Sequence, residues 1–133
     1  MITMGFEGLS TLILSSTRKA RLRSRIVDAL EAAAEPVADE IRAGAPEKSD
    51  GLRDSVRVER DEKNLKVTIS AGGTPETERP SGNGITYDEA VLTEFGTVHQ
   101  PAHPFFFPPI NEHADELESA ASSAVSGALG DDE

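Results

Sequence analysis

Two histidines, His99 and His103, have a spacing that resembles a metal site. A helical zinc site places two His four residues apart on one face of a helix, with a Glu between them. Here Pro101 stands between the histidines and Pro104 follows the second, so a helix cannot continue across the segment. We therefore expect no metal and no other cofactor, and we keep a small metal-dependent enzyme using His99 and His103 as the remote alternative.

The other polar residues do not form a recognisable catalytic set. The chain has no cysteine, which excludes disulfides and thiolate ligands, and no serine lies in a glycine elbow. Asp88, Glu89 and Glu94 could pair as acid and base, but acidic residues beside a strand are far more often solvated. The sequence therefore predicts a protein that is not an enzyme.

Residues 87–109 are rich in groups suited to contact. Phe105, Phe106 and Phe107 cannot all face one small core, because successive residues of an extended chain point to opposite sides. Prolines fix φ and remove backbone donors, and four of the eight in the chain are Pro101, Pro104, Pro108 and Pro109. We expect a stiff extended arm that docks on a helix of the same chain or on a neighbouring subunit.

The charge is distributed unevenly along the chain. The formal net charge is -11, yet residues 80–133 contain no Lys or Arg and ten acidic residues. Such an acidic half repels nucleic acid. We interpret it either as a solubilising surface or as a wall past which DNA slides without binding.

The basic residues crowd the first turns of a predicted helix, where the helix dipole disfavours positive charge. They are Arg18, Lys19, Arg21, Arg23 and Arg25. The cluster is either a solvated face with ion pairs along the helix or an electrostatic contact with an acidic surface, such as the acidic half of an adjacent subunit.

Apolar periodicity predicts two long helices. The first runs over residues 17–43, with Pro36 expected to kink or split it, and carries an apolar face at Leu22, Ile26, Leu30, Ala33, Val37 and Ile41. The second begins near Pro108 and Pro109, where a missing donor costs nothing, and residues 130–133 should fray.

Three strands are expected between these helices. Leu52, Val56 and Val58 open the first strand, and residues 65–71 alternate as the second, forming an antiparallel hairpin. Residues 85–97 are interpreted as a third strand, broken near residues 88–90, while residues 1–8 are a short entry segment and residues 72–84 a mobile loop. The prediction is a single α+β domain over residues 1–133, with both helices packed on a small, mainly antiparallel sheet of three to four strands.

Several motifs resemble the head-to-tail joining, or tail-completion, proteins of long-tailed phages. They are A-P at 45–46 with G-L-R-D-S-V at 51–56, Tyr87 with Ala90, E-F-G-T at 94–97, and Q-P-A-H-P-F-F at 100–106 with Pro108. The resemblance implies a motif that contacts other subunits. Its residues are Tyr87, Glu94, Phe95, Gly96, Thr97, Pro101, His103, Pro104, Phe105, Phe106, Phe107 and Pro108.

The resemblance also implies a role and partners. The expected protein is a structural component of the virion that forms a homo-oligomeric ring, usually of six subunits, at the neck, where it completes the tail. Its partners would be the head-closure or connector protein, the tail-tube protein, and DNA in transit through the lumen. A tail-tube or head-closure ring is the alternative. No apolar run approaches the roughly 18 residues of a membrane span, so we expect no membrane contact.

Overall fold

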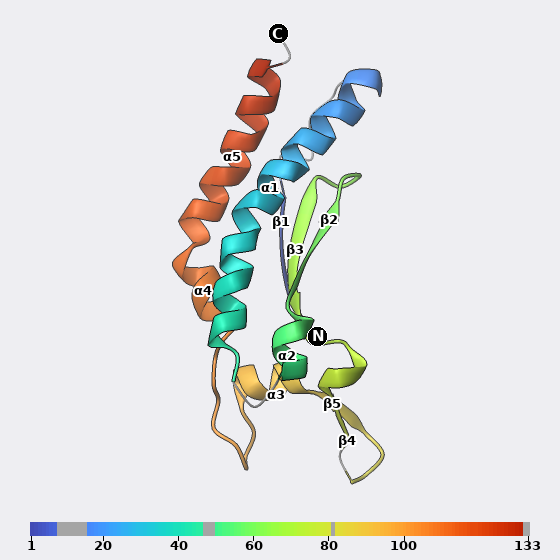
Figure 1. The fold of residues 1–133 in the computed structure, drawn as a ribbon, viewed down its shortest axis with the longest axis vertical. Coiled ribbons are helices and arrows are strands. Elements are labelled where there is room, and N and C mark those ends of the chain that lie inside the picture. The colour runs from blue at the N-terminus through green and yellow to red at the C-terminus, as the bar shows by residue number, and fades with distance from the viewer. Residues whose placement is uncertain (8–15, 47–49, 81, 132–133) are drawn as a thin grey trace.

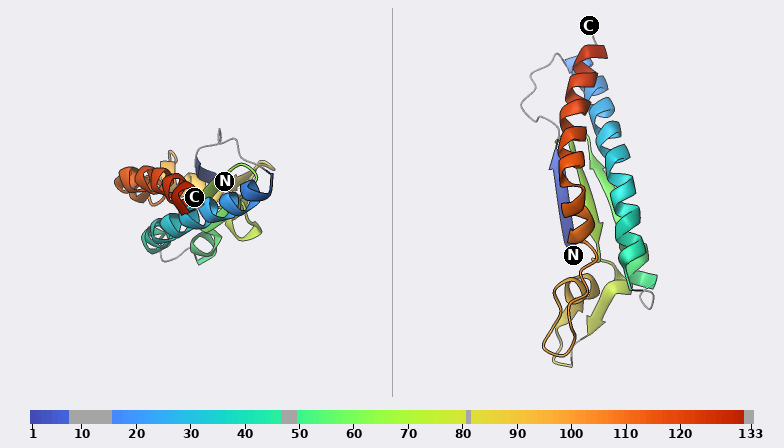
Figure 2. Two further views of the ribbon diagram at one scale, coloured as in Figure 1. Left: turned by 90° about the horizontal axis from the view of Figure 1, so that it is seen from above. Right: turned by 90° about the vertical axis from the view of Figure 1, so that its left-hand side faces the viewer.

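The computed structural model describes residues 1–7, 16–46, 50–80 and 82–131. Two long helices, α1 (Ser16–Gly44) and α5 (Ala114–Asp131), lie side by side along a three-stranded sheet, and shorter elements gather beyond one end of that sheet (Figure 1). Views at right angles show an elongated molecule in which α1 and α5 cover one face of the sheet (Figure 2). The α+β prediction, with a long helix near each end of the chain, is confirmed.

Helix α1 has the bounds that its apolar spacing predicts, to within a residue. The side chains of Leu22, Ile26, Leu30 and Ile41 are fully buried, and α1 packs against the sheet and α5 through this stripe. Pro36 lies inside the helix without splitting it. Because Pro36 is on the exposed side, water can satisfy the carbonyl that loses its usual donor.

The large sheet has the strand order β1-β3-β2 and is antiparallel throughout. Its strands are β1 (Ile2–Glu7), β2 (Arg57–Asp61) and β3 (Lys66–Ala71). The β2–β3 hairpin was predicted, but the entry segment predicted over residues 1–8 is wrong for Ile2–Glu7, which form β1, while residue 8 lies outside the described residues. β1 pairs with β3, some sixty residues away in the sequence, in a register that sets Met4 opposite Ile69. The alternation of Ile2, Met4 and Phe6 is compatible with a strand, but a local pattern does not say which distant strand it pairs with.

The strand predicted to open at Leu52 starts later than expected. Leu52 lies in a short helix, α2 (Asp50–Ser55), and the strand begins only at Arg57. Leu52 and Val56 are both buried. Their spacing of four fits one face of a helical turn as well as it fits a strand, so the apolar pattern alone did not decide between the two.

The end of the molecule opposite the start of α1 contains four short elements. They are the 3₁₀ turn η1 (Pro75–Thr77), strands β4 (Glu78–Pro80) and β5 (Thr86–Asp88), and helix α3 (Glu89–Phe95). The third strand predicted over residues 85–97 is therefore wrong beyond Asp88, where a helix begins. Residues 72–84, expected to form a loop, include η1 and β4, and β4 pairs with β5.

The closing helical region is divided in two. Helix α4 (Phe107–Glu112) starts one residue before the predicted proline pair, and His113 separates it from α5. Helix α5 continues to Asp131, into the segment expected to fray, and residues 132–133 lie outside the described part of the chain. Buried residues of α1, the sheet, α4 and α5 form one core cluster. No helix among the described residues is long and apolar enough to cross a membrane.

Candidate functional site

The motif at residues 94–97 lies where α3 ends and the chain turns back on itself. Gly96, with φ of 75°, closes the helix by donating its N–H to the carbonyl of Leu92 at 2.8 Å. This left-handed conformation favours glycine. A Cβ on Gly96 would also stand 2.7 Å from the backbone nitrogen of Ala102, so the close approach of the returning chain excludes a side chain here.

The buried carboxylate of Glu94 holds the three consecutive phenylalanines in place. Its side chain is 4% exposed, and its Oε1 accepts the N–H groups of Phe105 and Phe106, each at 2.9 Å. Its Oε2 accepts the N–H of Phe107 at 3.1 Å. The first N–H groups of a helix lack partners within the helix. In α4 the two residues after Phe107 are prolines, which have no N–H. Glu94 and the prolines together therefore leave few N–H groups of the first turn without a partner.

The aromatic rings of this segment are divided between core and surface. Phe105 and Phe106 are 2% and 0% exposed, with an edge-to-face arrangement at 6.5 Å between ring centroids. Phe107 is half-buried and packs edge-on against Phe106 at 5.0 Å. Phe95 lies 6.3 Å from Phe107 and remains 63% exposed. The aromatic segment therefore packs into its own subunit through Phe105 and Phe106, and it leaves Phe95 at the surface.

Residues 96–104 form a fixed loop rather than the extended arm that the prolines suggested. Thr97 and Gln100 exchange backbone hydrogen bonds, with the Thr97 N–H donating at 2.8 Å and the Gln100 N–H at 3.3 Å. Beyond them, the N–H of His103 donates to the carbonyl of Thr93 at 2.7 Å. The chain thus leaves α3, turns and returns to its end.

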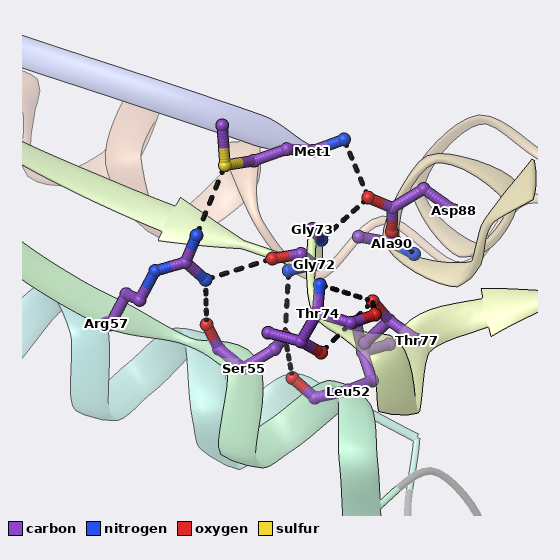
Figure 3. A network of polar contacts seen from close by, with 10 residues as sticks. All are labelled: Met1, Leu52, Ser55, Arg57, Gly72, Gly73, Thr74, Thr77, Asp88 and Ala90. Carbon is purple, nitrogen blue, oxygen red and sulfur yellow. Dashed lines mark hydrogen bonds and ion pairs between the residues drawn. The ribbon is translucent and has the colours of Figure 1, made fainter.

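A second polar network joins α3 to the start of the chain (Figure 3). The carboxylate of Asp88 accepts hydrogen bonds from the N–H groups of Ala90 and Gly73, at 2.9 and 2.8 Å, and forms an ion pair with the α-ammonium group of Met1 at 2.6 Å. Partial burial raises the pKa of Asp88, but the Met1 ammonium and the two N–H donors outweigh it and hold the pKa below its ordinary value.

Arg57 and Ser55 extend this network to the end of β3. The guanidinium group of Arg57 donates to the carbonyls of Ser55 and Gly72, at 2.7 and 2.9 Å, and contacts the sulfur of Met1 at 3.2 Å. The hydroxyl of Ser55 accepts the N–H of Gly72 at 2.8 Å. Sequence reasoning missed this network. An Asp directly before a helix is a recognised capping signal, but nothing in the sequence indicates the other contacts.

The predicted contact residues differ widely in exposure. Glu94, Phe105 and Phe106 are buried within the subunit, and Gly96 and Phe107 are half-buried. The exposed members are Tyr87, Phe95, Thr97, Pro101, His103, Pro104 and Pro108. Contact with another subunit stays a prediction for these exposed residues, whereas the buried ones position them.

The basic cluster lies far from this site. The start of α1 is at the opposite end of the molecule from α3 (Figure 1). Arg21 is exposed and Arg23 and Arg25 are half-buried, while the side chains of Arg18 and Lys19 lie outside the described residues. The structure therefore does not bring the basic cluster and the aromatic segment together within one subunit.

Neither histidine of the loop lies in a ligand cluster. His99 and His103 are exposed, and among the described residues the one group of three potential ligands is Glu40, Glu112 and His113, with ligand atoms within 4.8 Å of one another. Both ring nitrogens of His113 already have carboxylate partners: Nδ1 lies 2.9 Å from Glu116 on α5, and Nε2 lies 2.8 Å from Glu40 on α1. Hydrogen bonds to these carboxylates raise the pKa of His113, and the group links the two helices.

Comparison with known families gives one match. Residues 14–96 match the family described as "Bacteriophage HK97-gp10, putative tail-component". The matched region runs from before α1 to the glycine that ends α3, and so covers most of the chain. No curated protein and no solved structure gives a significant match.

Proposed function

The chain belongs to the HK97-gp10-like family of bacteriophage tail components, and on this premise we propose that it forms a ring at the junction of head and tail. The ring completes the tail and joins it to the head. Its neighbours are the connector or head-closure protein on one side and the tail-tube protein on the other. DNA passes through its lumen.

The exposed apolar end of the subunit supports this proposal most directly. Five of the six large exposed apolar residues described lie between residues 85 and 98: Ile85, Tyr87, Val91, Phe95 and Val98. Glu94 and the Asp88 network hold this end in a fixed shape. Such a concentration of exposed large apolar side chains in one short stretch of the chain supports a protein–protein interface at this end.

The charge of α5 supports passage of DNA without binding. Asp115, Glu116 and Glu118 are exposed on this helix, and no Lys or Arg lies beyond residue 79. An acidic surface repels the phosphate backbone. A ring that turns such surfaces inward leaves the DNA free to slide.

Disrupting the gene in the phage that carries it tests the role. We expect filled heads and detached tails in negative-stain micrographs, and restored particles when purified protein is added to the extract. Gold-labelled antibody should mark one position at the head-proximal end of each tail. Label along the whole tail would indicate a tube subunit, and normal particles without the protein would refute the proposal.

A further inference from the structure

A histidine and two glutamates from separate parts of the fold converge beside the last turns of α1. Glu40 lies on α1, Glu112 is the last residue of α4, and His113 is the single residue between α4 and α5. One ligand atom of each residue lies within 4.8 Å of the ligand atoms of the other two. Helix α4 contacts α1, so the break between α4 and α5 places the imidazole ring against α1 (Figure 1).

The backbone fixes the position of His113 from both sides. Its N–H donates to the carbonyl of Pro109 at 3.1 Å, and its carbonyl accepts the N–H of Leu117 at 2.9 Å. The first of these bonds closes α4 and the second opens α5. The side chain of His113 is 22% exposed, so the ring is also restricted by its neighbours. The ring is therefore held in place by the fold itself.

The two nitrogens of the ring have different surroundings. Nδ1 lies 2.9 Å from Glu116, and Nε2 lies 2.8 Å from Glu40. A histidine that binds a metal almost always donates its other ring N–H to a carboxylate, a carbonyl or water, which fixes the tautomer and the direction of the ring. Glu116 supplies such a carboxylate at Nδ1. Nε2 is then the nitrogen that faces the group formed with Glu40 and Glu112.

The cluster contains more negative charge than one imidazolium ring balances. Glu40, Glu112 and Glu116 surround a single histidine, and in the part of the chain that the structure describes none of the three has a Lys or Arg partner. Like charges brought together from different helices repel one another. A divalent cation bound between Glu40 and Glu112 removes this repulsion.

We propose that Glu40, Glu112 and Nε2 of His113 bind one divalent transition-metal ion of the zinc class, while Glu116 orients the ring. Imidazole and carboxylate are both ordinary zinc ligands, at about 2.0 to 2.2 Å, whereas calcium and magnesium prefer oxygen ligands alone. Ligand atoms around one tetrahedral ion lie roughly 3.3 Å apart. Small rotations of the two exposed carboxylates reach this spacing.

The metal takes the place of the proton on Nε2, which is released to solvent, and the Nδ1 proton keeps its hydrogen bond to Glu116. The ion ties the end of α1 to the junction of α4 and α5. It does not use His99 or His103, the pair whose spacing first raised the question of a metal. The site is independent of the proposed ring, because every ligand comes from one subunit.

Calorimetric titration of the full chain with zinc chloride at pH 7, after EDTA treatment and dialysis, tests the site. We expect one zinc ion per chain and no displacement of zinc by excess magnesium. Glu112→Gln should weaken zinc binding by more than about tenfold, and Glu116→Gln by about tenfold to a hundredfold. His103→Gln is the matched control for His113→Gln, because His103 is exposed outside the cluster and its loss should leave zinc affinity unchanged.

Two further readouts identify the ligands and separate binding from folding. Nitrogen NMR of the His113 ring should show a zinc-dependent shift at Nε2, with the Nδ1 proton retained. Zinc should raise the urea midpoint of the natural chain but not that of Glu112→Gln, since a ligand that binds the folded state stabilises it. Without zinc the two unfolding curves should coincide, because Glu112 is exposed.

Three results would overturn the inference. The first is a natural chain that binds no zinc. The second is equal zinc affinity in the natural chain, Glu112→Gln and His113→Gln, which would show an adventitious ion only. The third is a zinc signal at the rings of His99 and His103 in place of His113. None of these measurements depends on assembly, so each result leaves the proposed function to its own test.

Discussion

Replacing Glu94 by Gln should destabilise the subunit strongly, although the two side chains have nearly the same shape. The carboxylate accepts three backbone N–H groups in a site that is 4% exposed. A Gln oxygen in the position of Oε1 keeps the bonds to Phe105 and Phe106 without their charge assistance. Its NH₂ group then faces the N–H of Phe107, donor against donor.

The magnitude follows from these contacts. Leaving one buried N–H unsatisfied costs about 1 to 3 kcal/mol, and a hydrogen bond to a neutral group is about 1 kcal/mol weaker than one to a charged group. The smaller cost of burying an amide instead of a charge offsets part of the loss. We expect Glu94→Gln to lower the free energy of unfolding by about 2 to 4 kcal/mol.

Urea unfolding followed by circular dichroism measures this change. Glu35→Gln is the matched control, because Glu35 is exposed on α1 and the same substitution there should stay within about 0.5 kcal/mol. Amide hydrogen exchange adds a local readout, since the amides of Phe105, Phe106 and Phe107 should exchange faster in Glu94→Gln. Equal unfolding curves for the two variants, with unchanged exchange at these amides, would refute the capping role of Glu94.

Three further predictions concern stability. Phe106→Ala should lower the free energy of unfolding by about 3 to 5 kcal/mol because the ring is fully buried; a loss below about 1 kcal/mol in urea unfolding would show that the core repacks around the cavity. Asp88 has a lowered pKa, so the stability that its carboxylate contributes is complete above the ordinary carboxyl pKa and is lost as pH falls through the lowered pKa. The Asp88→Asn variant, which can still cap α3, should therefore lose less stability between pH 7 and pH 3 than the natural chain. His113 has a raised pKa, so the stability that its charged ring contributes is complete below the ordinary histidine pKa and is lost as pH rises through the raised pKa. In His113→Gln the free energy of unfolding should therefore change less with pH across that range. An unchanged pH dependence would contradict the link between α1 and α5.

The aromatic segment has both buried and exposed rings, which explains why so many phenylalanines lie close together in the sequence. Phe105 and Phe106 anchor the segment in the core, and Glu94 holds their backbone. Phe95 is left outside on the same frame. A change at Glu94 should therefore disturb both the folding of the subunit and the exposed surface around Phe95.

The sequence by itself determined the elements that depend on local patterns. The apolar repeat defined α1 to within a residue, and strict alternation defined β3 because neighbouring side chains of a strand face opposite sides. The proline pair located the start of α4 because proline lacks the donor that the first helical turn cannot use. The motifs between residues 45 and 108 pointed to a phage tail-component family, and the family match over residues 14–96 confirms that family.

Only the tertiary structure decided the elements that depend on distant partners. β1 exists because β3 offers a free edge, and the stretch after Asp88 is a helix because Asp88 caps it and Gly96 closes it, although its apolar residues were compatible with a strand. The sequence suggested that Glu94 is a solvated acid. The fold instead buries its carboxylate against three N–H groups that lie eleven to thirteen residues further along the chain. Propensity and period act over a few residues, whereas burial and hydrogen-bond partners are assigned only when the whole chain is in place.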